Sequence, residues 1–338
     1  MPIKILFSSY VFHPSVGGVE TVSRLLAAQF ARAGHEVELI TETPGGEFAG
    51  ANYGVTRKPS LAQLVRLLRW CDVLFQNNIS LRSLVPARLL RRRVLVVHQT
   101  WIQNESGGIG WNDRMKYALL PGVTNVAISR AVADVLGVPA AIIGNPYDEN
   151  VFRVLPNVVR DKTLVFLGRL VSDKGVDLLL EALKLLRSAG LTPGLTIIGS
   201  GPEEADLRRL ATESGLDSQV EFVGEKTGAA LAEILNRHRI LVAPSRWPEP
   251  FGIVALEGIA CGCVVVGSAQ GGLSEAIGPC GLTFPNGDAR ALAQALSRVL
   301  EDPAECDRLR QDAAAHLARF TPQYVANLYL DAMKDALR

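Results

Sequence analysis

The sequence predicts an α/β protein made of two domains in series, each a parallel sheet wrapped by helices. The chain has 338 residues, and a domain typically holds about 100 to 200. Short apolar runs alternate with amphipathic helical stretches, which is typical of parallel sheets. The alternation lapses in a polar, proline-containing stretch at 145–156 and then restarts. We therefore predict two Rossmann-like domains, with the boundary after residue 152.

The first domain is expected to open with a β-α-β unit. Residues 3–8 form a buried apolar run, 20–33 have an amphipathic helical pattern, and 36–41 form a second apolar run. The weaker signals that follow predict strands at 73–76, 94–98 and 125–128 and helices at 60–70 and 80–90.

The second domain repeats the same order of elements. A strand at 163–167, a loop, a helix at 175–188 and a strand at 195–198 form its first unit. After residue 288 the pattern is helical, and Asp302-Pro303 and Thr321-Pro322 are typical helix starts. The remaining signals predict strands at 220–223, 240–243 and 264–267 and helices at 228–236 and 253–261.

Composition and charge exclude several classes of protein. The formal net charge of +1 gives no reason to expect bulk nucleic-acid binding, although residues 1–155 hold 16 Lys/Arg against 11 Asp/Glu. The five cysteines lack metal-ligand spacing and are expected to be reduced, buried thiols. No signal-peptide pattern and no run of about 20 apolar residues is present, so we expect a cytoplasmic protein.

The ends of the predicted strands carry the residues most suited to ligand binding, because open parallel sheets bind ligands at their carboxyl edge. Gly17-Gly18 follows the first strand and precedes a helix, where backbone N–H groups can approach an anionic ligand. A turn that requires glycine explains this pair equally well. Residues 168–175 place Arg169 and Lys174 around a strand-to-helix loop. Two cations there would clamp a diphosphate without a metal, and a solvated basic loop is the alternative.

The segment 245–257 follows the strand at 240–243 and holds two carboxylates. Glu249 lies in the loop and Glu257 inside the next helix. The carboxylates would accept hydrogen bonds from sugar hydroxyls. The pair is also compatible with glycoside hydrolysis, but the neighbouring cations fit a leaving diphosphate better than a neutral glycan. The helix start would offer free N–H groups to a phosphate at Phe251, Gly252, Ile253 and Val254.

Two further strand ends are candidates for weaker roles. His98 closes the strand at 94–98 and is a candidate for a polar catalytic contact. Residues 270–275 contain Gly271-Gly272 and Glu275, which fit close approach to a ligand or a simple turn. A dehydrogenase is not supported, because Gly199-Ser200-Gly201 lacks the third glycine of the dinucleotide motif.

Taken together, these motifs resemble the retaining glycosyltransferases of family four. The resemblance rests on Gly-Arg-Leu-x-x-x-Lys-Gly at 168–175, on the E-x7-E pair Glu249 and Glu257, and on Gly-Gly-x-x-Glu at 271–275. It spans nearly the whole chain. It implies the GT-B fold, in which two Rossmann-like domains face each other across a cleft and a C-terminal helix, here 322–338, returns to the first domain. The first domain, 1–152, would bind the acceptor, and the second, 153–321, the nucleotide-sugar donor.

The resemblance also implies a role for each matching residue. Arg169 and Lys174 would hold the donor diphosphate and stabilise it as it leaves. Glu257 would bind the ribose, and Glu249 the transferred sugar. The amides of Phe251, Gly252, Ile253 and Val254 would touch sugar and phosphate, Gly17 and Gly18 would allow the first domain to approach the phosphates, and His98 would face the donor sugar.

The implied activity is metal-independent transfer, with retention, of a hexose-type sugar from a UDP- or GDP-linked donor. The acceptor would be a hydroxyl of a glycan, a lipid-linked or a small molecule. The chain departs from the family at Gln99, where Asp is common, at Ser274, where Pro is common, and at Pro146, where Gly is frequent. A nucleotide-sugar epimerase and a non-catalytic sugar-nucleotide-binding subunit remain as alternatives.

Positive charge is concentrated in one part of the first domain. A functional interpretation is attraction to an anionic lipid surface or a phosphorylated acceptor, and hence peripheral contact with the inner face of a membrane. A solvated helix end fits the same pattern. The residues concerned are Arg82, Arg88, Arg91, Arg92 and Arg93.

Overall fold

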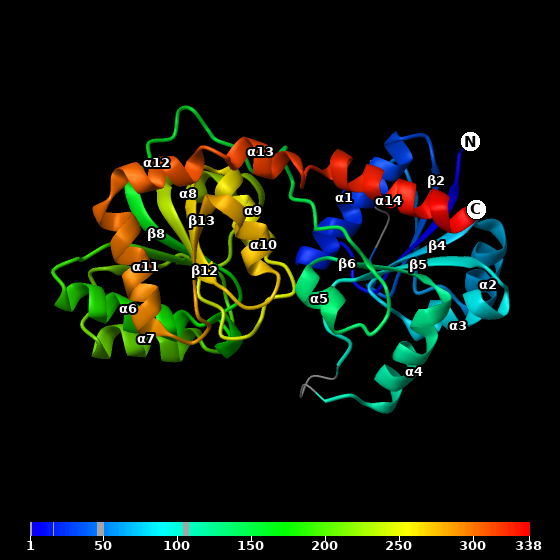
Figure 1. Ribbon diagram of the computed structural model, residues 1–338, viewed down its shortest axis with the longest axis horizontal. Coiled ribbons are helices and arrows are strands. Elements are labelled where there is room, and N and C mark those ends of the chain that lie inside the picture. Colours follow the sequence, from blue (N-terminus) through cyan, green and yellow to red (C-terminus); the bar gives the residue numbers. More distant parts are fainter. Residues whose placement is uncertain (1, 16, 46–50, 104–107) are drawn as a thin grey trace. The chain divides into compact units, whose positions relative to one another are not determined.

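The computed structural model describes residues 2–15, 17–45, 51–103 and 108–338, and the chain divides into two compact units. Unit 1 consists of Met1–Pro146 and Phe320–Arg338, and unit 2 of Tyr147–Arg319. Each unit contains one wholly parallel sheet, so the predicted fold class is confirmed (Figure 1). The predicted boundary after residue 152 falls within unit 2, a few residues beyond the observed transition.

Unit 1 is built on a seven-stranded sheet in the order β3-β2-β1-β4-β5-β6-β7. The predicted strands are present, with ends shifted by a residue or so. Strands β3 and β7, which are short and lie at the two edges of the sheet, were not predicted. The strands are β1 (Lys4–Ser9), β2 (Glu36–Thr41), β3 (Gly54–Arg57), β4 (Val73–Asn77), β5 (Arg93–His98), β6 (Thr124–Ala127) and β7 (Ala141–Ile142).

The helices of unit 1 pack on both faces of this sheet. Helix α14, the last of the chain, packs against α1, while α2 and α3 contact each other and the sheet. Tyr329 of α14 stacks edge-on against Phe75 at 5.2 Å between ring centroids, and Phe75 also contacts Phe7 and Phe30. The expected return of the C-terminal helix is therefore confirmed. The helices are α1 (Gly18–Arg32), α2 (Leu61–Trp70), α3 (Leu81–Leu89), α4 (Trp111–Leu119), α5 (Arg130–Asp134) and α14 (Pro322–Leu337).

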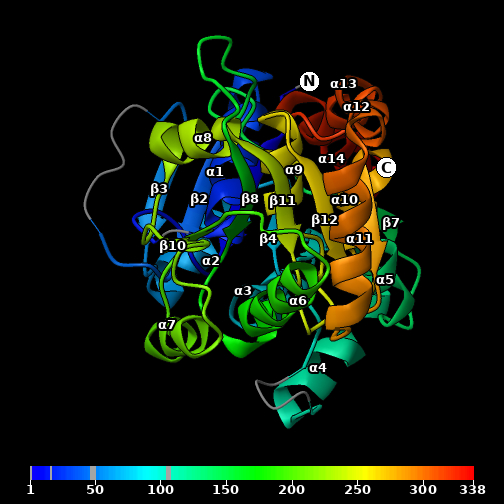
Figure 2. The same cartoon turned by 90° about the vertical axis from the view of Figure 1, so that its left-hand side faces the viewer.

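Unit 2 is built on a six-stranded sheet in the order β10-β9-β8-β11-β12-β13. Helices α6, α7 and α11 pack with the strands into one continuous apolar core, and α8, α9 and α10 lie against the other face (Figure 2). Its elements are β8 (Lys162–Leu167), α6 (Val176–Ser188), β9 (Leu195–Ile198), α7 (Glu204–Glu213), β10 (Val220–Phe222), α8 (Gly228–Arg237), β11 (His238–Ala243), α9 (Ile253–Ala260), β12 (Val264–Ser268), α10 (Leu273–Ile277), β13 (Gly281–Phe284), α11 (Ala289–Glu301), α12 (Pro303–Arg310) and α13 (Ala313–Ala318).

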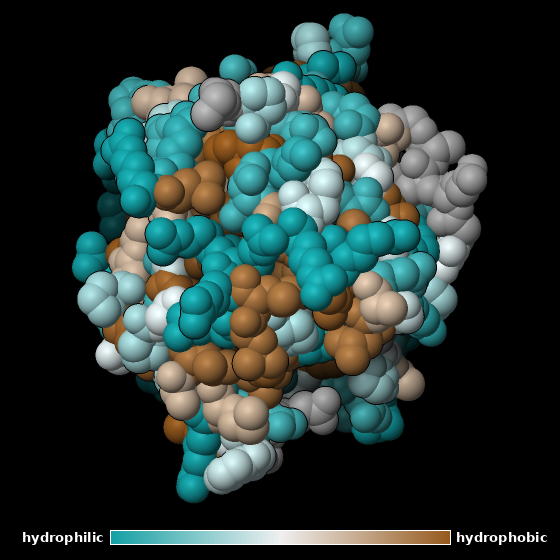
Figure 3. Space-filling view, turned by 90° about the vertical axis from the view of Figure 1, so that its right-hand side faces the viewer, coloured by the Kyte–Doolittle hydropathy of each residue, from teal (hydrophilic) through white to brown (hydrophobic). Residues whose placement is uncertain are grey.

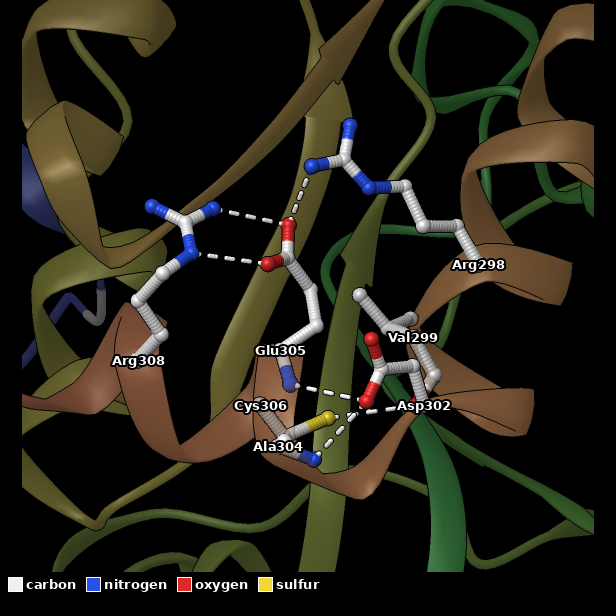
Figure 4. Close-up of polar contacts among 7 residues, drawn as sticks. All are labelled: Arg298, Val299, Asp302, Ala304, Glu305, Cys306 and Arg308. Carbon is white, nitrogen blue, oxygen red and sulfur yellow. Dashed lines mark hydrogen bonds and ion pairs between the residues drawn. The ribbon is translucent and has the colours of Figure 1, made fainter.

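The predicted helix starts at Asp302 and Thr321 are confirmed by their side-chain caps. Asp302 accepts hydrogen bonds from the N–H groups of Ala304 and Glu305, and Thr321 accepts one from Tyr324. Figure 4 shows that Glu305, in the first turn of α12, also lies between Arg298 and Arg308. The hydrogen bonds from Arg308 keep the pKa of this carboxyl below its usual range. These charges fasten α12 to α11 at the surface of unit 2.

Three expectations from composition concern the whole chain. All five cysteines are buried free thiols, as predicted. Among the residues that the structure describes, no group of three or more His, Cys, Asp or Glu side chains is placed to hold a metal ion. No described helix has the length and apolar character that crossing a bilayer requires.

Candidate active site

The Arg169–Lys174 loop of unit 2 follows the carboxyl end of β8 and leads into α6. It closes with a 3-10 turn at Ser172–Lys174 and with Gly175, whose φ of 66° lies in the left-handed region. A Cβ added to Gly175 would come within 2.1 Å of the carbonyl oxygen of Pro244. Glycine is therefore required here, and its absent side chain lets this loop approach the one that follows β11.

Lys174 and Glu249 meet where these two loops approach each other. The Nζ atom of Lys174 lies 2.5 Å from Oε1 of Glu249, and both side chains are largely buried. The hydroxyl of buried Ser245 donates to the same carboxylate oxygen at 2.6 Å. Two donors therefore orient the Glu249 carboxylate. The ion pair and its hydrogen bond in turn hold Lys174 at the carboxyl end of the strands.

The glycine pair at 271–272 supports Glu249 rather than forming a separate site. The N–H of Gly272 donates to the carbonyl of Glu249 at 2.6 Å, and Gly271 forms a parallel β-bridge with Glu249. Gly271 has a φ of 88°, and an added Cβ would lie 2.3 Å from the same carbonyl oxygen. The sequence left open whether this motif contacts a ligand or forms a turn. In the structure its backbone supports the loop that carries Glu249.

Sequence reasoning missed several residues that hold these loops. Ser268 and Asn286 both donate to the carbonyl of Ser245, at 2.7 and 3.0 Å. Gly199 and Gly201, considered above only as a failed dinucleotide motif, allow the backbone at 199–201 to lie against residues 168–170. The N–H of Leu170 donates to Ser200 at 2.9 Å across this contact. The spacing of Ser245, four residues before Glu249, was the one sequence signal available.

The N-terminus of α9 lies directly after the Glu249 loop. Gly252 precedes the helix with a φ of 100°, and Phe251 is buried. The first-turn N–H groups of Ile253 and Val254 have no acceptor within their own helix, as at any helix N-terminus. A phosphate or sugar oxygen would find hydrogen-bond donors and the positive end of a helix dipole here.

Glu257 lies in the second turn of α9 and is half-buried. Burial, followed by the nearby charge of Asp148, raises the pKa of its carboxyl to about 7. Asp148 is itself buried, in the segment that opens unit 2. A hydrogen-bond donor such as a sugar hydroxyl would stabilise the ionised carboxylate and lower this pKa.

Arg169, the other predicted cation, is exposed on the loop after β8. Within the described parts of the chain it forms no recorded hydrogen bond or ion pair, whereas nearby Arg246 is bound to Asp177 at 2.6 Å. The structure thus brings Lys174 and Glu249 together, places the predicted amides beside them, and leaves the guanidinium of Arg169 available to an anion.

His98 belongs to unit 1 and ends β5, as predicted, but it is fully buried. The side-chain amide of Asn125 donates to the carbonyls of Leu120 and Val123, so its oxygen remains as the acceptor for His98 Nε2 at 3.0 Å. His98 therefore carries its proton on Nε2, and Nδ1 is a buried acceptor without a partner among the described residues. Burial lowers the pKa of the imidazole, which keeps it neutral.

The family departure at Gln99 is explained by its neighbours. The side-chain amides of Gln99 and Asn145 pair reciprocally at 2.7 and 3.0 Å, and Gln99 also donates to Asn77 at 2.7 Å. Asn77 in turn donates to Ser23 of α1 at 2.7 Å. A neutral, buried network therefore takes the place of the usual acidic residue and ties the loop after β5 to α1.

Gly17 and Gly18 also belong to unit 1, at the start of α1, and Val16 of the predicted loop lies outside the described residues. The φ of Gly17 is 175°, an extended value open to any residue. An added Cβ would meet only the flexible carboxylate of Glu20, at 2.6 Å. Local geometry therefore does not require a glycine at position 17.

Comparison with known proteins defines the class to which this site belongs. A family model described as glycosyl transferases group 1 matches residues 148–316, half of the chain, and one described as glycosyltransferase family 4 matches residues 16–151. Solved structures of similar fold cover nearly the whole chain. The chain therefore belongs to the group 1, family 4 glycosyltransferases, and its fold is GT-B.

Two curated relatives illustrate the sequence similarity. The chain is 36% identical over 186 residues to a D-inositol 3-phosphate glycosyltransferase from Stackebrandtia nassauensis, covering 52% of this chain and 42% of the relative. It is 31% identical over 239 residues to a glycogen synthase from Mycobacterium tuberculosis, covering 68% of this chain and 53% of the relative. The chain spans about half the length of the curated relatives it matches.

Two solved structures illustrate the similarity of fold. Anabaena HepE in complex with UDP and glucose has a TM-score of 0.81 and 20% identity, covering 98% of this chain and 99% of that one. Sucrose-phosphate synthase from Thermosynechococcus elongatus has a TM-score of 0.80 and 23% identity, covering 98% of both chains.

Proposed function

We propose that the protein is a retaining glycosyltransferase that moves a hexose-type sugar from a nucleotide diphosphate to an acceptor hydroxyl without a metal ion. The observation that carries the proposal is the pairing of Lys174 with Glu249 beside the N-terminus of α9. A diphosphate needs cations and N–H donors, and a sugar needs oriented hydrogen-bond acceptors. This edge of unit 2 supplies both.

Donor binding would exchange the partners of this ion pair. Without a ligand, Lys174 and Glu249 neutralise each other. With a donor, Lys174 would turn to the diphosphate together with Arg169, and Glu249 would accept hydrogen bonds from sugar hydroxyls while Ser245 keeps it oriented. Glu257 would accept bonds from the ribose hydroxyls as the ionised carboxylate. The ion pair would therefore keep the charges of Lys174 and Glu249 compensated until a donor binds.

The transfer step breaks the bond between the anomeric carbon and the phosphate oxygen, and the bonding electrons leave with the diphosphate. The acceptor oxygen attacks on the same face, and its proton passes to a donor phosphate oxygen. The contribution of the protein is electrostatic, because Arg169, Lys174 and the α9 N–H groups would stabilise the charge that develops on the leaving group.

For unit 1 we propose a role in acceptor binding, and for His98, at its carboxyl edge, a contact with a sugar hydroxyl. His98 is neutral and keeps a free acceptor atom at Nδ1. A sugar hydroxyl could use that atom once the covering residues move, since the imidazole is fully buried in this structure. Acceptors of this class would be hydroxyls of a glycan, a lipid-linked sugar or a small molecule.

The donor is best identified by binding before any acceptor is known. HepE, a protein of the same fold, has been crystallised with UDP and with UDP-glucose, so UDP-glucose is the first donor to test beside GDP- and ADP-sugars. Thermal shift in the presence of EDTA should show stabilisation by one donor. Glu257→Ala should abolish the shift, and Glu213→Ala, at the exposed end of α7, should leave it unchanged. If no donor stabilises the protein, the proposal is wrong.

Slow release of free nucleotide from the stabilising donor separates transfer from the alternatives. A transferase should release the nucleotide diphosphate together with free sugar, using water as a poor acceptor. An epimerase would instead convert the donor into an isomeric sugar nucleotide, which is resolved by chromatography. Stabilisation with neither reaction would favour a non-catalytic subunit.

A further inference from the structure

The arginine-rich part of unit 1 divides into two places in the structure. Arg82 lies against Glu42 and donates to the carbonyl of Pro59 at 2.6 Å, beside a small cavity formed by β1 and β2 residues. The other four line a separate pocket of about 480 Å³. The five arginines therefore do not form the single charged cluster that the sequence predicted. The four pocket residues, called the arginine pocket below, are Arg88, Arg91, Arg92 and Arg93.

The arginine pocket lies at the amino edge of the sheet. It includes the residues that open β5 and β6, Arg93 and Thr124. His98, at the other end of β5, belongs to the carboxyl edge. Because all strands of this sheet are parallel, the pocket and His98 lie on opposite edges of unit 1. The pocket is thus a second site, and it does not form part of the transfer site.

Backbone carbonyls hold two of the guanidinium groups in place. Arg88 donates to the carbonyl of Gly122, and an added Cβ at Gly122 would collide with the same guanidinium. Arg92 donates to the carbonyl of Arg69, at 2.9 Å, where α2 ends, while its buried Nε has no partner among the described residues. Both cations are therefore oriented before any ligand arrives, which reduces the entropy cost of binding.

The arginine pocket has no counter-ion among the residues that the structure describes. Across the described ranges of the chain, no carboxylate lies within ion-pair distance of any of its four arginines. Helix dipoles explain why positive charge is favourable at Arg88 and Arg92, because these residues lie near the carboxyl ends of α3 and α2. Exposed Arg91 lies just after α3, with a φ of 54° where glycine is usual, and is open to the same explanation, whereas exposed Arg93 opens β5 and is not.

We propose that the arginine pocket binds the phosphate group of an anionic ligand. Planar guanidinium forks match the oxygens of phosphate, and several uncompensated arginines around one concave surface favour a group that carries two or more negative charges. Figure 3 shows a band of hydrophilic side chains between hydrophobic patches on the face of the molecule that it draws. The ligand is either a soluble phosphate compound or the headgroup of a membrane lipid.

Calorimetric titration with pyrophosphate tests the pocket itself. The full chain with Arg169→Ala and Lys174→Ala removes the two donor-site cations, so the result is independent of the proposed transfer. Adding Arg91→Glu and Arg93→Glu should weaken pyrophosphate binding at least about tenfold, because the two substitutions remove two positive charges and add two negative ones. Arg32→Glu changes an exposed arginine of α1 outside the pocket and should change the dissociation constant by less than about twofold.

A second variant and a vesicle assay complete the test. Gly122→Ala displaces Arg88 without changing the charge, and it should also weaken binding. Sedimentation with phosphatidylglycerol vesicles, against phosphatidylcholine vesicles, distinguishes the two sources of phosphate. Vesicle binding that pyrophosphate displaces and that Arg91→Glu/Arg93→Glu abolishes identifies a lipid headgroup, and pyrophosphate binding alone identifies a soluble ligand. The proposal is overturned if neither probe binds, or if Arg32→Glu weakens binding as much as the pocket variants do.

Discussion

The carboxyl edges of the two sheets differ in their chemistry. In unit 2 this edge carries opposite charges in contact, Lys174 with Glu249 and Arg246 with Asp177. In unit 1 the ends of β4 and β5 carry neutral, buried groups, the amides around Gln99 and the uncharged His98, although Arg82 and Glu42 form an ion pair beyond the end of β2. These parts of two sheets with similar topology therefore differ in charge. Ion pairs lie where a diphosphate would leave, and neutral hydrogen bonds surround His98.

The strongest test of this difference is Lys174→Ala. Transfer should fall about 10²–10³-fold, as when one preorganised group that stabilises developing charge is removed. The melting temperature should change little, because the side chain lies at the edge of the sheet and outside the core. Rates with a donor and acceptor give the first value and calorimetry the second, with Lys184→Ala, at an exposed position of α6, as the matched control. Parallel losses of stability and rate would contradict the assignment.

A backbone change at Gly271 should have the next largest effect. Gly271→Ala forces a Cβ against the Glu249 carbonyl and should reduce transfer at least tenfold, as well as lowering stability. Gly190→Ala is the matched control, because Gly190 has a similar φ of 85° and open space around it. That variant should lose only about 1 kcal/mol of stability and keep its rate. Equal rates for the two variants would show that Glu249 does not depend on this support.

In unit 1 the expected effect is on stability and not on donor binding. Gln99→Ala removes the donor to the side-chain oxygen of Asn77 and both side-chain hydrogen bonds between Gln99 and Asn145, and it should cost about 1–3 kcal/mol in the free energy of unfolding. Donor affinity measured by thermal shift should not change beyond this offset. A double-mutant cycle with Asn145→Ala should show a coupling energy, since the two amides bond each other. Loss of donor affinity in Gln99→Ala would remove the distinction between the two edges.

The smallest expected effect is a proton released on donor binding. The Glu257 pKa of about 7 should fall when ribose hydroxyls bond the carboxylate, so affinity should rise several-fold between pH 6 and pH 8. Titrations at pH 7 in two buffers of different ionisation enthalpy measure the proton directly. Glu257→Gln should abolish the release.

The same pKa shift makes a prediction about the free protein. Because the folded state holds the proton more tightly than the unfolded chain, Glu257 should lower the stability progressively as the pH rises from about 4.5 to 7, with no further loss above that. Glu257→Gln should remove this decline from the pH profile of unfolding. An unchanged profile would mean that the carboxyl titrates normally.

Most of the sheet architecture was predictable because the central strands are continuous apolar runs. Short edge strands such as β3 and β13 were not, since each begins with glycine and is only partly buried, so neither forms a continuous apolar run. Lys174 and Glu249 were found because each lies in a loop after a predicted strand, where parallel sheets bind ligands. The residues that support the candidate sites were missed. Gly271 allows the carbonyl of Glu249 to come close, and Asn125 determines which ring nitrogen of His98 carries the proton. Both depend on residues distant in sequence.

Because α14 completes unit 1, that unit is assembled from both ends of the chain, and unit 2 is an insertion with two junctions, near residues 146 and 319. Exchange of unit 2 between relatives therefore requires cuts at both junctions. A single crossover would place a relative's side chain, in the position of Tyr329, against Phe75. Exchange at both junctions would transfer the proposed donor site as a whole, whereas removal of α14 would expose the aromatic core of unit 1, although α14 follows unit 2 in the sequence.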